Sequence, residues 1–294
     1  MKLQYTVSEQ DNFFNIKELI KCKFNISDRL LTKLKKNNYI FLNKLPCNIK
    51  EQVTVNDIIE IDLGYSEDNS NIVPSQMNLN ILYEDEYLLI VNKPYNMPVH
   101  PSMAHFTDSL SNGIKYYFDS ISLHKKIRPV NRLDRDTSGI VIFAKNEYIQ
   151  ECLIKQMANK TFIKEYIAIC KGYSEKKEGT IIAPIARKKD SIIERCIDST
   201  GDTAITHFHI TKSSDTYSII HLKLETGRTH QIRVHLAHIG LPIIGDTLYG
   251  VPSSLIDRQA LHSSKVCFIH PISNEQLEIN APLYDDMKKI INEL

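Results

Sequence analysis

Short runs of β-branched and aliphatic residues recur along the last two thirds of the chain, and they limit its fold more than any other feature. They often alternate between apolar and polar side chains and are separated by turn-forming residues. The clearest runs cover residues 88–91, 139–143, 166–169, 204–210, 217–224 and 265–270, and helical patterns cover 146–158 and 229–239. Because most strands follow one another without a crossover helix, we expect an α+β fold with a mixed, mostly antiparallel central β-sheet and flanking helices.

A polar stretch divides the chain into two parts of unequal size. Residues 65–78 contain a proline and show little periodicity, so we interpret them as a linker. Residues 12–64 then form a small αβ domain, and residues 79–294 form the larger domain with the central sheet.

The small domain is predicted to combine two helices with short strands. Ser27 is a suitable N-cap for a helix that begins at Asp28, and residues 13–24 supply a second helix. Residues 39–42 and 58–63 have the pattern of strands.

One face of the helix after Ser27 is basic. Arg29, Lys33 and Lys36 are spaced four and three residues apart, so they form one stripe on a face away from the leucines. Residues 13–50 as a whole carry nine Lys or Arg against two acids. A segment of this kind is typical of a phosphate-binding surface, although a basic stripe is also common on solvated faces.

Composition restricts the possible partners and cellular location of the protein only slightly. The net charge of +1 says nothing about an anionic partner, and the longest apolar runs are too short to cross a bilayer. The first residues lack the apolar segment of a secretory signal, so we expect a cytoplasmic protein. Six scattered cysteines without a CxxC pair favour free thiols over disulfides or zinc ligands.

A single carboxylate, Asp134, stands out in the segment 128–146. It lies among arginines 128, 132 and 135 and just before a Thr-Ser-Gly turn and a buried strand. Neighbouring guanidinium groups favour the charged carboxylate, which can act as a nucleophile or a base. The alternative is that Asp134 and Asp136 are ion-pair partners that fix a loop, and these residues alone favour that interpretation.

A second cluster of polar side chains follows Gly227. Arg228, His230, Arg233 and His235 fall within about two turns of a predicted helix. Clusters of donors at this density bind phosphates or orient a carboxylate.

Three segments together resemble the signature motifs of RluA-type pseudouridine synthases. They are ILYEDEYLLIVNKPYNMPVHPS (81–102), RPVNRLDRDTSGIVIFAKN (128–146) and LKLETGRTHQIRVHLAHIGLPIIGDTLYG (222–250), and the resemblance covers residues 80–285. The small domain, with SDRLLTKLKKNNYIFLNKLP followed by VNDIIEIDL, resembles the S4 RNA-binding domain. The resemblance implies an isomerase that flips uridines out of RNA and converts them to pseudouridine. This reaction needs no net oxidation, hydrolysis or energy input, so we expect no cofactor and no metal.

The resemblance also implies a catalytic set. Asp134 matches the single essential aspartate, Arg233 matches the basic residue that pairs with it, and Tyr166 matches the tyrosine that packs on the uracil ring.

Four further residues are expected to bind substrate. Arg132 matches the arginine that holds or replaces the flipped base, and Ile232 walls the base pocket. Arg228 and His230 are expected to contact RNA rather than to act in catalysis. One departure is Asn131, where family members commonly have histidine, and it puts any role for an imidazole there in doubt.

Other function classes fit less well. Histidines gather at positions 207, 209, 230, 235 and 238, but no HExxH motif supports a zinc hydrolase, and no G-x-S-x-G elbow supports a serine hydrolase. The main alternative is a non-catalytic S4-type RNA-binding or ribosome-assembly factor on the same scaffold. The expected partner is RNA, with large-subunit ribosomal RNA ahead of transfer RNA. We expect a monomer that does not interact with membranes.

Overall fold

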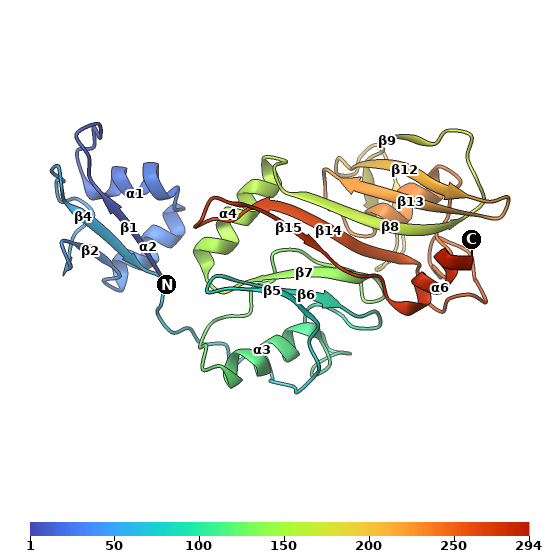
Figure 1. The fold of residues 1–294 in the computed structure, drawn as a ribbon, viewed down its shortest axis with the longest axis horizontal. Helices are drawn as coiled ribbons and strands as arrows, with labels where there is room; N and C mark the ends of the chain where they lie inside the picture. Colours follow the sequence, from blue (N-terminus) through green and yellow to red (C-terminus); the bar gives the residue numbers. More distant parts are fainter. Residues whose placement is uncertain (294) are drawn as a thin grey trace.

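The computed structural model describes residues 1–293 and places them in a small N-terminal unit and a larger body (Figure 1). In the N-terminal unit, helices α1 (Ile16–Phe24) and α2 (Asp28–Lys36) cover an antiparallel sheet with the strand order β1-β4-β2-β3. Its strands are β1 (Lys2–Thr6), β2 (Ile40–Leu42), β3 (Leu45–Pro46) and β4 (Ile58–Asp62). Because β1 pairs with β4, residues before position 12 also belong to this sheet.

The two predicted helices of the N-terminal unit are confirmed. The Ser27 hydroxyl accepts a hydrogen bond from the backbone N–H of Leu30 at 3.1 Å, which caps α2 as expected. Leu30, Leu31 and Leu34 are buried against the sheet. Residues 65–78 contain no helix or strand within the described chain, and they lead from β4 into the body.

The body is built around one large sheet. Within residues 1–293, nine strands form it, eight of them in the order β5-β6-β7-β14-β8-β13-β12-β9 and the ninth, β15, paired with β14. The β7–β14 pair is parallel and the other pairs are antiparallel, so the predicted mixed, mostly antiparallel sheet is confirmed. Its strands are β5 (Ile81–Glu84), β6 (Leu88–Lys93), β7 (Ser138–Ala144), β8 (Ile163–Lys171), β9 (Glu178–Ile182), β12 (Ile205–Ser213), β13 (Tyr217–Leu224), β14 (Leu261–Ile269) and β15 (Gln276–Asn280).

Side-chain alternation along β6 and β7 explains how helices cover both faces of this sheet. Leu89 and Val91 point to the face covered by α3 (Leu110–Ser120), while Leu88 and Ile90 point to the face of α4 (Glu147–Ala158). Further along the sheet, α5 (Gln231–His238) and α6 (Asp285–Glu293) pack on a second core. A separate hairpin consists of β10 (Ile185–Arg187) and β11 (Arg195–Ile197).

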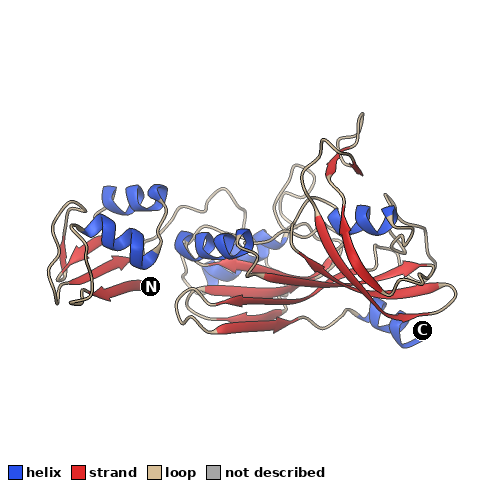
Figure 2. Ribbon diagram, turned by 90° about the horizontal axis from the view of Figure 1, so that it is seen from above, coloured by secondary structure: helices blue, strands red, loops and turns tan. Residues whose placement is uncertain are grey.

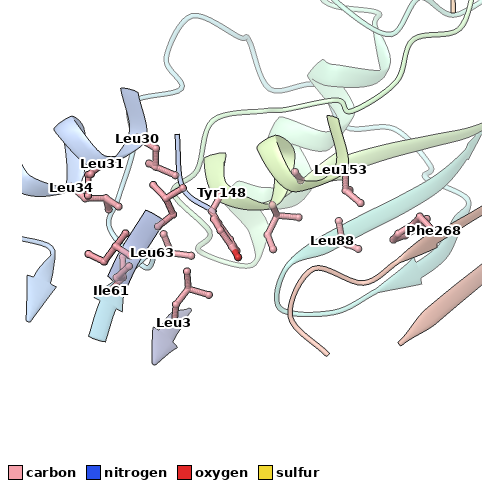
Figure 3. Close-up of a cluster of buried hydrophobic side chains, with 14 of the residues drawn as sticks. Leu3, Leu30, Leu31, Leu34, Ile61, Leu63, Leu88, Tyr148, Leu153 and Phe268 are labelled. Atoms are coloured by element: carbon pink, nitrogen blue, oxygen red, sulfur yellow. The ribbon is translucent and has the colours of Figure 1, made fainter. Parts of the chain in front are cut away.

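The N-terminal unit lies at one end of the long sheet, as Figure 2 shows. A continuous apolar cluster nevertheless joins the two parts: Leu3, Leu30 and Leu63 of the N-terminal unit belong to the same cluster as Tyr148 and Leu88 of the body (Figure 3). Among residues 1–293, no helix is long and apolar enough to cross a membrane.

Candidate active site

A cavity of about 530 Å³ opens between the loop before β7, the strand β8 and the start of α5. Its size is that of a small-molecule pocket. The seven residues that the sequence predicts for catalysis and substrate binding within the larger domain line it: Arg132, Asp134, Tyr166, Arg228, His230, Ile232 and Arg233. Segments about 100 positions apart in the chain therefore converge on one site.

Asp134 lies on a tight loop that ends in β7. The backbone N–H of Thr137 donates to the Asp134 carbonyl at 3.2 Å and closes the turn. Gly139 then has φ +115°, and a Cβ atom there would come within 2.2 Å of the Ser263 carbonyl oxygen on β14. Only glycine permits this approach, so Gly139 fixes where the loop joins the sheet.

Asn131 holds the other end of this loop against β7. Its amide nitrogen donates to the Ile140 carbonyl at 2.9 Å, and its amide oxygen accepts from the Ile142 N–H at 2.9 Å. One side chain thus supplies a donor and an acceptor to the strand. Asn131, which stands where the family commonly has histidine, therefore positions the Asp134 loop.

Arg233 links Asp134 to a second carboxylate, Asp246. Arg233 Nη1 lies 3.1 Å from Asp134 Oδ2, while Nε and Nη2 donate to the two oxygens of Asp246 at 2.7 and 2.8 Å. The Asp246 side chain is fully buried and also accepts from the N–H groups of Leu248 and Tyr249. Burial raises the pKa of Asp246, but the hydrogen bonds and charge of Arg233 outweigh it and hold that pKa below its usual value.

Asp246 is a site residue that the sequence analysis missed. It follows Gly245, whose φ is +71° and whose Cβ would meet the Arg258 carbonyl at 2.1 Å. An acidic residue directly after such an obligatory glycine, within the conspicuous segment GDTLYG, was the available signal.

Asp134 pairs with Arg233, as the family resemblance implied, and not with the arginines that lie near it in the sequence. Arg128 forms an ion pair with Glu67 at 2.6 Å, and Arg135 pairs with Asp136 at 3.0 Å. Neither neighbour in sequence is therefore free for Asp134, whose cationic partner comes from α5 instead.

Tyr166 and Ile232 form an apolar wall next to the carboxylate. Tyr166 lies on β8, Ile232 lies in the first turn of α5, and both side chains are buried. Burial raises the pKa of Tyr166 to about 12, so its phenol is protonated at neutral pH. A flat aromatic ring beside an aliphatic side chain suits the face of a nucleobase.

Cationic side chains surround this wall. Arg132 is exposed and forms no hydrogen bond or ion pair among the described residues, whereas Arg228 donates to the Thr203 carbonyl at 3.0 Å. Lys164, also missed from sequence, lines the cavity two residues before Tyr166, on the same face of β8. Burial lowers its pKa, and within residues 1–293 it has no anionic partner.

His230 lies between Asp134 and Tyr249. Its Nδ1 atom is 2.8 Å from the Tyr249 hydroxyl, and its Nε2 atom is 3.9 Å from Asp134 Oδ2. Another nearby histidine, His235, uses both ring nitrogens in hydrogen bonds to Thr206 and to the Ala183 carbonyl. Within the described chain, no group of three or more His, Cys, Asp or Glu could hold a metal ion.

The basic stripe on α2 lies outside the cavity. Lys33 pairs with Glu67 at 3.0 Å and with Glu147 at 2.9 Å, so its charge is engaged at the junction of the two parts. Arg29 is 90% exposed, and Lys36 is exposed as well. Two of the three predicted phosphate-binding residues are thus open to solvent.

Residues 87–238 match the family model described as RNA pseudouridylate synthase. Over 270 residues the chain is 38% identical to the uncharacterized RNA pseudouridine synthase YjbO of Bacillus subtilis (strain 168). This match covers 92% of this chain and 95% of that protein. It is 34% identical to the ribosomal large subunit pseudouridine synthase D of Blochmanniella floridana, over 82% of each chain. Among solved structures, human RNA pseudouridylate synthase domain containing 1 matches with a TM-score of 0.58 at 24% identity, over 74% of this chain and 94% of that protein's chain. The two proteins therefore share a fold.

Proposed function

The chain belongs to the RNA pseudouridylate synthase family and isomerises uridine in RNA, and we propose that it acts on large-subunit ribosomal RNA with Asp134 as its catalytic carboxylate. The observation that carries the proposal for Asp134 is its setting. The partly exposed carboxylate of Asp134 faces the cavity. It contacts the buried Arg233, which is itself fixed by its ion pair with Asp246. Such a carboxylate is oriented before the substrate arrives.

The reaction breaks the N1–C1′ bond of uridine, turns the uracil and forms a C5–C1′ bond. The proton on C5 leaves at the end, and N1 gains a proton, so atoms balance without a co-reactant. Two roles fit Asp134: attack on a carbon of the nucleotide, or removal of the C2′ proton. In either role its free oxygen must face the ribose, while Arg233 orients the carboxylate.

The cavity wall would hold the detached base. Extruding a base from a paired region costs a few kcal/mol, which stacking on Tyr166 and contact with Ile232 would offset. Arg132, exposed at the cavity, could fill the gap that the base leaves in the stack.

Basic side chains support an RNA substrate. A second cavity of about 490 Å³ shares Gly227, Arg228 and Thr229 with the first and adds Arg187 and Arg195, which suits the phosphates of a strand that continues past the target nucleotide. In the N-terminal unit, whose sequence resembles an S4 domain, Arg29 and Lys36 would add phosphate contacts without reading the bases.

The choice of large-subunit ribosomal RNA is supported by relatives that carry this substrate in their names, including those of Blochmanniella floridana and Haemophilus influenzae at 34% identity. Transfer RNA is the second candidate. We further propose that the protein works as a monomer in the cytoplasm, where ribosomal RNA is made in bacteria such as these.

The test is release of tritium from RNA labelled at C5 of uridine, because formation of the C5–C1′ bond expels that hydrogen. The purified protein should release tritium from large-subunit ribosomal RNA transcripts, and Asp134→Asn should release none while it still binds RNA. Loss of binding together with activity would assign Asp134 a structural role. Binding without release by the wild-type protein on ribosomal and transfer RNA would favour a non-catalytic RNA-binding protein.

A further inference from the structure

His230 connects the catalytic carboxylate to a tyrosine outside the base pocket. It precedes α5 with φ 58°, and its side chain is only 12% exposed. Its two ring nitrogens face different groups, Nδ1 the hydroxyl of Tyr249 and Nε2 the carboxylate of Asp134.

The hydroxyl of Tyr249 fixes where the imidazole carries its hydrogen. This hydroxyl accepts a hydrogen bond from the backbone N–H of Arg195 at 2.7 Å, a group that can only donate. The phenol hydrogen then needs an acceptor, and among the described residues the atom within reach is His230 Nδ1 at 2.8 Å. A neutral imidazole that accepts at Nδ1 carries its hydrogen on Nε2.

The other side of the ring favours the same tautomer. With its hydrogen on Nε2, His230 presents a donor to Asp134, whereas the opposite tautomer would present a lone pair to a negative charge. Burial lowers the pKa of His230, so the ring is neutral at neutral pH. The groups that face it are Asp134, Arg233, Arg195, Asp246 and Tyr249.

Both neighbours of Asp134 approach the same oxygen. Arg233 Nη1 lies 3.1 Å and His230 Nε2 lies 3.9 Å from Oδ2. The second distance is longer than a hydrogen bond, and contacts of this kind commonly tighten when substrate fills a site. Once His230 also donates to Oδ2, this oxygen is held by two donors and Oδ1 is left to face the ribose.

We propose that His230 is a positioning residue whose Nε2–H, set by the Tyr249 hydroxyl, holds Oδ2 of Asp134 so that Oδ1 reacts. This inference rests on the function proposed above, and it replaces the RNA contact expected for His230 from the sequence. Because Arg195 belongs to β11, the hairpin β10–β11 anchors the far end of this hydrogen-bond chain.

The tautomer can be measured without any activity. Nitrogen-15 NMR of protein labelled in the histidine rings, with His230 assigned by its loss in His230→Asn, should show hydrogen on Nε2 at neutral pH. Tyr249→Phe keeps the ring that packs on Arg233 and removes only the hydroxyl, so it should convert His230 to a mixture of tautomers. Hydrogen on Nδ1 in the wild-type protein would overturn the proposal even if the enzyme is active.

Kinetics provide the second arm. In glutamine the amide nitrogen falls near the place of Nε2, whereas in asparagine it falls near Nδ1. His230→Asn should lower kcat about tenfold with KM and RNA affinity unchanged, and His230→Gln should recover most of the loss.

His238, exposed on the same helix, provides a matched control, and His238→Asn should leave kcat unchanged. Equal losses of RNA affinity in His230→Asn and His230→Gln, with kcat preserved, would identify an RNA contact and refute the positioning role. Absence of tritium release by the wild-type protein would count against the proposed function, and the NMR result would still decide the tautomer.

Discussion

Replacement of Asp246 by asparagine tests whether Asp246 supports Asp134, the proposed catalytic carboxylate, through Arg233. The substitution keeps the size of the side chain and an acceptor for the N–H groups of Leu248 and Tyr249, but it removes the charge that Arg233 contacts at 2.7 and 2.8 Å. The side chains of Arg233 and Asp246 are 6% and 0% exposed. Breaking a buried pair of this kind costs about 3–5 kcal/mol. Because Arg233 keeps Asp134 as a partner, we expect about 3 kcal/mol.

This loss should appear in two assays. Urea denaturation should show the reduced free energy of unfolding, and the melting temperature should fall by about 5 °C. Arg233 should also turn fully towards Asp134, and a displacement of about 1 Å at a reacting group lowers kcat about 100-fold. Tritium release should be measured well below the melting temperature, so that unfolding does not contribute.

A second arginine–aspartate pair provides the control. Arg258 binds both oxygens of Asp286, at 2.7 and 3.0 Å, and Asp286 is 21% exposed. Asp286→Asn should lower stability by less than Asp246→Asn and leave kcat within about threefold of wild type, because Arg258, unlike Arg233, does not contact Asp134. A loss of stability in Asp246→Asn with kcat near wild type would refute the argument that Asp246 supports catalysis through Arg233.

Three further outcomes are expected. Lys164→Met should weaken RNA binding and reduce the slope of log affinity against log salt by about one, with kcat preserved. The reason is that a partly buried cation without an anionic partner in the cavity suits a phosphate contact. An unchanged slope would contradict this. Combined alanine substitutions of Arg29 and Lys36 should weaken RNA binding in filter assays more than Lys33→Ala does, because the Lys33 charge is already paired with two acids. The reverse order would show that Lys33 leaves these acids when RNA binds. Burial lowers the pKa of Lys93 from 10.5 to about 7, so between these pH values the unfolded chain binds a proton that the folded protein does not. The free energy of unfolding of the wild type, relative to that of Lys93→Met, should therefore rise above pH 7 by up to about 1.4 kcal/mol per pH unit. Urea denaturation at several pH values checks this sign, and a difference that falls with pH would be contrary to it.

Much of the fold could be predicted because local patterns determine it. The Ser27 cap, the strand at 217–224 and the helix near 229–239 all depend on neighbouring residues, and the structure has them as α2, β13 and α5 within a few residues. Helix α3 was not predicted, although Leu110, Ile114 and Phe118 fall on one face. Its Ser-Asn-Gly sequence is a poor helix signal, and burial against β6 and β7 overrides it.

The site could be predicted where the family motifs carry it, and not where a residue acts only through a contact that the fold creates. All seven predicted residues converge on the cavity, and Arg233 pairs with Asp134 as the family resemblance implied. The local sequence had also suggested that neighbouring arginines would favour the charged form of Asp134. Ion pairs with Glu67 and Asp136 engage two of these arginines, and only the fold brings Arg233 across from α5. Asp246 was missed for the same reason, because its role exists only through its contact with Arg233.

The central claim, that this chain isomerises uridines through Asp134, is tested most directly by mapping pseudouridine in total RNA. Cells with and without the gene should be compared, and the deletion should be complemented with the wild-type protein or with Asp134→Asn. The account predicts that specific sites in large-subunit ribosomal RNA disappear on deletion and return only with the wild-type protein. Restoration of the same sites by Asp134→Asn would contradict it.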